Sequence, residues 1–395
     1  MQKFEKHSPV VVTEVTTKHE LRQFMQYPNR LYADNPNYIP SFYGDDLSDW
    51  TPGKNPAFDY CEARCWLAWR DGEIVGRIGA ILSHKANDKF GTHRMRFSQV
   101  DFVDDSEVSA ALFGMVERWA REKGCDQVHG PLGFTDMDRE GMLVEGFDRR
   151  SLFFTNYNAP YYLEHLTRLG YRKDVDWIEY RITVPAPGSA EAERLHKLSE
   201  FILKRKNLHV ATVHHKSEYG PFVRQVFELV NAAYAPLYGV VELSDEQIER
   251  YANKFIPLVD PEFVCFVLDK QDKLVAFGVT ALDPSVALKH SDGRLFPFGW
   301  AGVLNDLHHS DTLIMLLTAV RPDLQTEGIN AVMMDHVCQS CNRHGVQFAE
   351  TGPMLELNDH ILAQWKRLEK EQHKRRRCFI KDLNHDVNAA NTAAA

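Results

Sequence analysis

The chain has 395 residues, 44% of them hydrophobic and 26% charged, and its formal net charge is −9 at pH 7. This length favours two domains, and the acidic balance argues against a general nucleic-acid binder, which carries a basic stripe. No apolar run approaches the roughly 20 residues that span a bilayer, and the first residues lack a signal-peptide pattern. The seven scattered cysteines suit free thiols in a reducing compartment, so we expect a cytoplasmic protein.

The first half of the chain predicts a strand-rich α/β unit. Residues 66–81 read as two apolar strands around Asp71-Gly72, which is a strong hairpin signal. A further strand is expected over 95–103, followed by an amphipathic helix over 106–123 with Ser106 as its N-cap.

The same order of elements returns in the second half. Residues 263–279 predict a second hairpin, 312–320 a strand buried on both faces, and 331–343 a helix. Each copy then continues in a strand that stops at a Gly-Pro pair, Gly130-Pro131 in the first and Gly352-Pro353 in the second. One α/β unit is therefore repeated, with too long a period for a solenoid.

A stretch rich in proline and glycine separates the two copies. It covers residues 185–190 and predicts a linker. We therefore expect an N-terminal domain over 1–184 and a C-terminal domain over 191–384. The last residues, 385–395, have little to bury and predict a disordered tail.

A glycine-containing loop stands between the strand and the helix of the second copy. Its sequence is Gln325-Thr326-Glu327-Gly328-Ile329-Asn330. A loop of this kind at the start of a helix leaves free N–H groups that hold phosphate oxygens.

The order strand, Val-x-Pro, Gln-x-x-Gly-x-x, helix resembles the acyl-CoA-binding motif of the GNAT superfamily of N-acetyltransferases. Gln325 and Gly328 match the family pattern, while Asn330 stands where glycine or alanine is usual. The resemblance implies an α/β fold of two tandem GNAT-like domains, each a mixed, mostly antiparallel sheet flanked by helices. It also implies an acyl-CoA co-substrate held by Val320, Gln325, Gly328, Ile329, Asn330 and Asn358.

The first copy departs from this pattern at the matching place. Residues 104–107 carry three carboxylates there, which would repel a pyrophosphate. We therefore expect the C-terminal copy to bind the acyl donor and the N-terminal copy to serve the acceptor.

The segment from Gly130 to Tyr162 carries a second resemblance. It contains Gly-Pro at 130–131, Gly-x-Leu-x-x-Gly-Phe at 141–147 and Tyr-Asn-x-Pro-Tyr-Tyr at 157–162. The combination resembles a bacterial group of tandem GNAT-like acyltransferases similar to the bacterial ceramide synthase, which N-acylates a sphingoid base. It implies direct attack of an amine on a thioester carried by CoA or acyl carrier protein, with no covalent intermediate.

Acyl transfer to an amine needs an aligned thioester, donors for the developing oxyanion and a base. The candidate bases are Glu145, Glu350 and Glu356, each with a solvated or capping role as the alternative. Glu145 follows an apolar run, so we expect its burial and a raised pKa. Tyr157 is the candidate catalytic tyrosine, with core packing as its alternative. The aromatic residues expected to line the acceptor cleft, or else to fill the core, are Phe134, Phe147, Tyr161 and Tyr162.

Two further patterns suggest sites but have simpler interpretations. His336, Cys338, Cys341 and His344 are metal-ligand types, yet one amphipathic helix would point them along more than one face. We therefore expect structural thiols and no metal. The basic run 374–377 reads as the solvated start of a final strand; the alternatives are contact with an anionic lipid headgroup or an acidic carrier protein.

Together these patterns predict an N-acyltransferase that acts on a small-molecule amine, favouring a lipid-like one such as a sphingoid base. Contact with the inner membrane surface is compatible with that acceptor, and a nucleic-acid partner is not expected. One alternative is a short-chain N-acetyltransferase for a soluble amine. Another is a catalytically lapsed GNAT-fold sensor or scaffold, which Asn330 favours.

Overall fold

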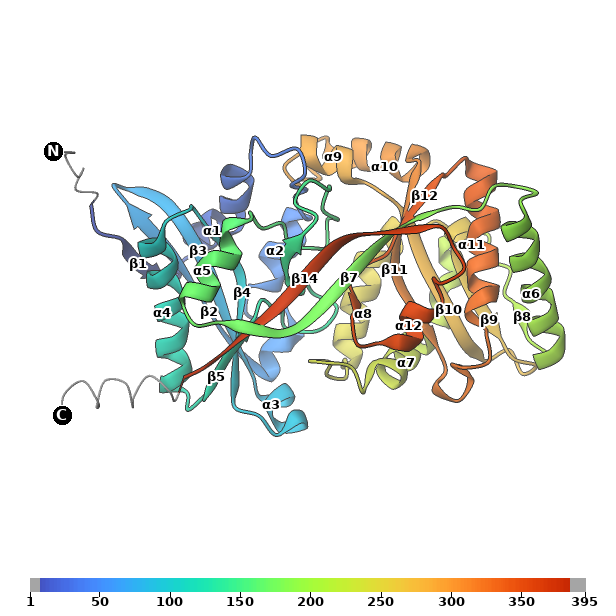
Figure 1. Ribbon diagram of the computed structural model, residues 1–395, viewed down its shortest axis with the longest axis horizontal. Helices are drawn as coiled ribbons and strands as arrows, with labels where there is room; N and C mark the ends of the chain where they lie inside the picture. The colour runs from blue at the N-terminus through green and yellow to red at the C-terminus, as the bar shows by residue number, and fades with distance from the viewer. Residues whose placement is uncertain (1–7, 384–395) are drawn as a thin grey trace. The chain divides into compact units, whose positions relative to one another are not determined.

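The computed structural model describes residues 8–383 and divides into two compact units (Figure 1). The first contains the residues up to Asp176 and those from Arg376 onward, and the second contains Trp177–Arg375. Two long strands, β7 (Arg172–Thr183) and β14 (Lys370–Asp382), contribute residues to both units. The tail over 385–395 lies outside the described residues.

The first unit is built on a sheet in which consecutive strands from β1 to β4 pair antiparallel. β4 and β5 then pair parallel, and the end of β14 pairs antiparallel with β5. The expected β2–β3 hairpin is confirmed: Asp71 and Gly72 have φ angles of 52° and 82°, both positive as a type I′ turn requires. The strands of this unit are β1 (Val11–Glu14), β2 (Cys61–Arg70), β3 (Glu73–Ser83), β4 (Arg94–Phe102), β5 (Gln127–Gly130) and β6 (Met142–Glu145).

Helices cover both faces of this sheet. Trp66 packs in the core with residues of α4, while its neighbour Leu67 packs with residues of α1 on the other face. The N-cap of α4 is Asp105 rather than the expected Ser106, because the Asp105 carboxylate accepts hydrogen bonds from the first N–H groups of the helix. The helices are α1 (Lys18–Leu31), α2 (Tyr43–Asp49), α3 (His84–Phe90), α4 (Ser106–Glu122) and α5 (Tyr161–Arg168).

The second unit has the same plan. β8 to β11 pair antiparallel in sequence order, β11 and β12 pair parallel, and β12 and β13 pair with β7. Its strands are β8 (His209–Val210), β9 (Val264–Leu268), β10 (Leu274–Leu282), β11 (Thr312–Val320), β12 (Phe348–Glu350) and β13 (Met354–Leu355). Its helices are α6 (Ala190–Lys206), α7 (Gly220–Tyr234), α8 (Asp245–Phe255), α9 (Ser285–His290), α10 (Gly299–His309), α11 (Asn330–His344) and α12 (Asp359–Ala363).

The internal repeat is thus present in three dimensions. β2, β3, β4, α4 and β5 of the first unit correspond to β9, β10, β11, α11 and β12 of the second. The predicted α/β fold of two similar units is confirmed. The copies differ most between the second and third of these strands, where the second unit inserts α9 and α10 between β10 and β11 and the first has only α3 between β3 and β4.

Candidate functional site

The parallel strands of the second unit separate after a short stretch of pairing. β11 and β12 pair only over Thr312–Ile314 and Phe348–Glu350. Beyond this point the N–H of Thr351 turns to the carbonyl of Tyr180 on β7, at 2.9 Å, while β11 stays paired with β10. A gap therefore opens in the sheet between the two strands.

A β-bulge in β11 lies at this gap. Val279 of β10 pairs with Leu317, and the next residue, Thr280, pairs with Met315. Leu316 is therefore the extra residue, and a bulged residue keeps its backbone groups out of the regular ladder. A backbone N–H that leaves the ladder is a donor of the kind that stabilises a developing oxyanion.

The gap continues into an apolar cavity of about 170 Å³. Side chains of β10, β11 and α11, the segment after β12, and α12 surround it. The lining includes Met315, Leu316, Leu317, Gly278, Val279, Met333, Met334, Val337, Cys338, Cys341, Pro353, Ile361, Trp365 and Leu368. Methionine side chains adapt to irregular apolar ligands, so the lining suits a flexible hydrocarbon chain.

A few polar groups interrupt this lining. The hydroxyl of Tyr234 donates to the carbonyl oxygen of Thr318 at 2.7 Å, and both residues line the cavity. The Nε2 of Gln364 is buried there without a hydrogen-bond partner among the described residues. An apolar pocket with a few placed polar groups is the usual form of a small-molecule site. Neither Tyr234 nor Gln364 was among the site residues expected from the sequence, because only the folded chain brings them to this gap.

The glycine loop lies beside the cavity and opens α11. Gly328 has a φ of +81°, and no side chain caps the start of α11 at Ile329. The N–H groups of Ala331 and Val332 donate to the carbonyl oxygens of Gly328 and Ile329, each at 2.9 Å. Ile329 is buried against Ile202 of α6, which anchors the loop. Uncapped N–H groups at a helix start, together with the helix dipole, favour an anion such as phosphate.

The corresponding helix start in the first unit is already occupied. The Asp105 side chain accepts from the N–H groups of Glu107 and Val108, and Arg70 lies 2.5 Å from Asp105 and 2.8 Å from Glu107. The hydrogen bond from Arg70 lowers the pKa of Asp105, so the cap stays ionised at neutral pH. An incoming phosphate would meet two carboxylates here.

The strand gap of the first unit is also closed. The N–H of Leu132 donates to the carbonyl oxygen of Phe97 at 3.0 Å, so the chain after β5 fills the space beside β4. A Cβ added at Gly130 would lie 2.3 Å from the same oxygen, which only glycine avoids. The two copies therefore share a fold but present an open and a filled gap.

The residues expected to bind the donor fall into two groups. Val320, Gln325, Gly328 and Ile329 lie together at the start of α11, and Asn330 lines the cavity. Asn358 instead caps α12, where its Oδ1 accepts from the N–H of Ile361 at 3.3 Å. The roles of both groups in donor binding stay predictions.

The expectation that Glu145 is buried is wrong. β6 exposes it at its end, because Met142 and Leu143 fill the core before the strand reaches solvent. Glu350 lies 3.2 Å from Lys374 Nζ, which also lies 3.2 Å from Glu179. Glu356 is paired with Arg375. The premise of a desolvated base at Glu145 therefore fails, and the other two candidates are paired carboxylates.

The aromatic residues expected at the acceptor side pack inside the first unit. The hydroxyl of Tyr157 accepts from Asn35 at 2.7 Å and donates to the Phe147 carbonyl at 3.2 Å. Tyr162 is fully buried beside Tyr161, with its hydroxyl 2.8 Å from that of Tyr32. The ring of Phe134 lies 5.1 Å from those of Trp50 and Phe58. These contacts are those of the core-packing alternative, and a role in lining a cleft stays a prediction.

Carboxyl groups with a raised pKa lie elsewhere in the first unit. Desolvation, with the nearby Asp138 carboxylate, raises the pKa of Asp136 to about 6. Burial next to Asp136 also raises the pKa of Glu140 well above its usual range. Acidic residues alternate at 136, 138 and 140, between Gly133 and Gly141. This spacing is visible in the sequence, but the candidate base expected from the sequence was Glu145.

The cysteines of α11 have the burial of structural thiols. Burial raises the pKa of Cys338 to about 11 and of Cys341 to about 12, so both stay protonated at neutral pH. Burial lowers the pKa of His336 on the same helix. The expectation that these residues hold no metal stays a prediction.

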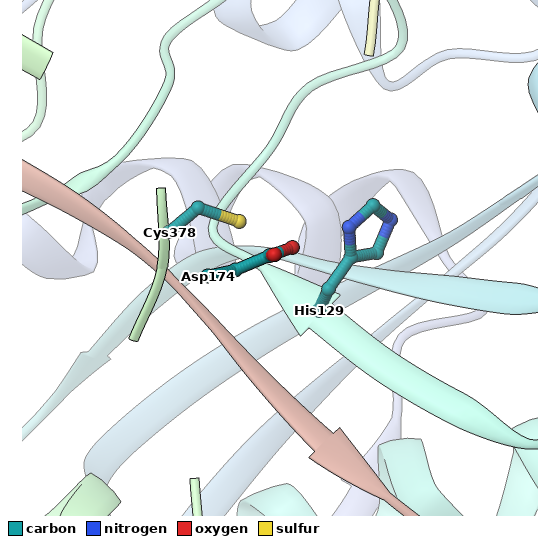
Figure 2. Close-up of side chains that lie close together, drawn as sticks. All are labelled: His129, Asp174 and Cys378. Carbon is teal, nitrogen blue, oxygen red and sulfur yellow. The ribbon is translucent and has the colours of Figure 1, made fainter. Parts of the chain in front are cut away.

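A different trio brings ligand types together in the first unit (Figure 2). The ligand atoms of His129, Asp174 and Cys378 lie within 4.8 Å of one another. However, Arg94 lies 3.8 Å from the Asp174 carboxylate, and the charges of Arg94 and Arg96 add to burial in lowering the pKa of His129. Two guanidinium groups already supply the positive charge here, which disfavours a cation.

Similar proteins agree with this architecture. The match to a tandem GNAT protein from the clavulanic acid biosynthesis pathway spans 95% of this chain and 98% of that protein, with 13% identity and a TM-score of 0.53. The match to a GCN5-related N-acetyltransferase from Sphaerobacter thermophilus spans 95% of this chain and 96% of that protein, with 12% identity and a TM-score of 0.51. The chain therefore has the tandem GNAT fold.

Two curated relatives match in sequence. Protein YghO of Escherichia coli (strain K12) is 27% identical over 383 residues, which are 94% of this chain and 95% of that protein. The bacterial ceramide synthase of Caulobacter vibrioides (strain NA1000 / CB15N) is 28% identical over 300 residues, 74% of this chain and 75% of that protein. No family model matches the chain. Within residues 8–383, no helix combines the length and apolarity that crossing a membrane requires.

Proposed function

We propose that the protein is an N-acyltransferase that moves an acyl group from a thioester to an amine, and that the second unit holds the donor. The observation that carries this proposal is the apolar cavity at the separated β11 and β12, next to the uncapped start of α11. The loop suits the phosphates of the donor and the cavity suits its acyl chain. The filled gap and capped helix of the first unit support a single donor site.

The chain's own groups suit each part of the reaction. The amine attacks the thioester carbonyl, a C–N bond forms and the C–S bond breaks. In this proposal the N–H of Leu316, the extra residue of the bulge, stabilises the developing oxyanion. The departing thiolate needs a proton, and Tyr234 brings a hydroxyl to this cavity. A base takes the proton that the amine releases.

The favoured substrates are a long-chain acyl donor and a lipid-like amine such as a sphingoid base. The size and apolar lining of the cavity support the long chain, and the relationship to a bacterial ceramide synthase supports the acceptor. The donor is carried by CoA or by acyl carrier protein. Because the acceptor is lipid-like, the same proposal includes peripheral contact of the protein with a membrane.

Thioester consumption by the purified protein tests this function. Acyl-CoA donors from acetyl to palmitoyl, and the matching acyl carrier protein donors, are supplied with sphinganine or with a soluble amine. We expect turnover that rises with chain length and requires sphinganine. Turnover with acetyl donors and soluble amines alone would favour the short-chain acetyltransferase. Donor binding without turnover on any amine would favour the sensor.

A further inference from the structure

The connection between β10 and β11 contains an insertion that the first copy lacks. It holds α9 and α10, whereas β3 and β4 are joined by α3 alone. The first unit completes the same sheet with the short connection, so the fold does not require the longer one. We call residues 285–309 the docking segment.

Large apolar side chains are exposed along this segment. Phe296 and Phe298 are each 80% exposed, and Trp300 is 47% exposed. Val286 and Leu304 are about half exposed. These five make up nearly half of the exposed large apolar side chains in the described part of the chain. A concentration of this kind marks an interaction surface.

The segment presents these side chains from a packed base. Val303 and Leu307 of α10 are buried, while Leu304 between them faces solvent. The N–H of Ala287 in α9 donates to the Asp306 carboxylate of α10 at 2.7 Å, so the two helices lie side by side (Figure 1). α10 is therefore apolar on two faces, of which the sheet and α9 cover one.

We propose that the docking segment binds the surface of an anionic lipid bilayer. Phenylalanine and tryptophan at an exposed tip are the residues that enter the interfacial region of a membrane. The aromatic side chains at 296, 298 and 300 fall within five residues, directly before and in the first turn of α10. They would insert beside the lipid headgroups while the base of the segment stays on the protein.

The segment does not share the acidic balance of the chain. Its basic residues are Lys289 and Arg294, which equal its carboxylates in number, and His290, His308 and His309 are exposed within it. Its carboxylates are Asp292 and Asp306, and the second is engaged by the N–H of Ala287. The chain as a whole carries −9, so this segment lacks the negative excess that would repel an anionic surface.

The location of the segment connects this surface with the candidate site. β10 and β11, which the segment joins, both line the apolar cavity. The unit that binds the donor would thus also contact the membrane that holds the amine or the acyl chain. This purpose rests on the proposed acyltransferase function, whereas lipid binding itself can be measured without any turnover.

Flotation with vesicles tests the proposal. The full chain is mixed with vesicles of phosphatidylglycerol and phosphatidylethanolamine, or of phosphatidylcholine alone, and the floated fraction is measured. We expect the protein to float with the anionic vesicles, and the double variant Phe296→Ser, Phe298→Ser to bind about 100-fold more weakly. Leu357→Ser is the matched control, since Leu357 is 76% exposed in the same unit outside the segment.

Each result is decisive. Failure of the wild type to float, or equal flotation of the double variant, would overturn the proposal. Self-association of the wild type that the double variant abolishes, without vesicle binding, would make the segment a protein interface instead. Gly328→Asp separates the two proposals: it should abolish turnover and leave flotation unchanged. A wild type that floats but never turns over would leave docking standing and remove the acyltransferase function.

Discussion

Gly278 offers a direct test of whether the cavity holds the acyl chain. It lies on β10, lines the cavity and pairs with Thr318 of β11. A Cβ added there would lie 3.7 Å from the Cβ of Met333, an ordinary contact, so the backbone accepts a side chain. Gly278→Val would direct two further methyl groups into the cavity and displace two to three methylenes of a long chain.

The size of the effect follows from the burial of methylene groups. Each buried methylene contributes about 0.8 kcal/mol, so displacing two or three costs about 2 kcal/mol, or roughly 30-fold in kcat/KM for a long-chain donor. An acetyl group has no long chain to displace, so acetyl-CoA should react as with the wild type.

Thioester consumption across a series of acyl-CoA chain lengths measures this change. Gly278→Ala is the control, with an expected loss of only a few-fold. Thermal unfolding should show that Gly278→Val is no less stable than the wild type, because the added methyl groups fill empty space. An unchanged chain-length profile in a folded Val variant would refute the placement of the acyl chain in this cavity.

Four further predictions address the loop, the charged groups and the base. Gly328→Asp should abolish CoA binding in calorimetry, because it adds a negative charge at the phosphate site and strains a φ of +81°. Glu145→Gln should lower kcat less than tenfold, since Glu145 is exposed; a loss of 10²–10⁴ would restore it as the base. Lys374→Met should cost about 3–5 kcal/mol in urea unfolding, because it removes the buried cation that pairs with the buried Glu179 and with Glu350. Asp136→Asn should raise the free energy of unfolding at pH 7 by about 3 kcal/mol, because the native pKa near 6 lies above the unfolded value near 3.8. The stability contributed by the protonated Asp136 is complete below about pH 4 and is lost as the pH rises through 6, so the variant should gain nothing at pH 4.

The fold was predictable because its signals are local. The Asp71-Gly72 turn, the stops at Gly130-Pro131 and Gly352-Pro353, and the glycine loop before α11 all depend on neighbouring residues, and all appear twice or match a known motif. The N-cap of α4 was misplaced by one residue because Asp105 and Ser106 are both good caps. Only the hydrogen-bond geometry distinguishes them.

The site was less predictable because burial depends on the whole fold. Glu145 follows apolar residues in sequence, yet the end of a strand faces solvent regardless of what precedes it. The lining of the cavity comes from eight separate stretches of the second unit, so no window of sequence contains it. The docking segment escaped notice for a similar reason: Phe296 and Phe298 look like core residues until the structure shows where they lie.

The two copies show how a duplicated unit can differ at one helix start and at one strand gap. In the first, Asp105 caps α4 and the backbone after Gly130 occupies the gap beside Phe97. In the second, Ile329 offers no cap, and the backbone after Glu350 turns to β7 instead. In both copies the backbone N–H groups at these positions need a hydrogen-bond partner. The position of that partner decides whether the sheet stays closed or leaves a gap for a ligand.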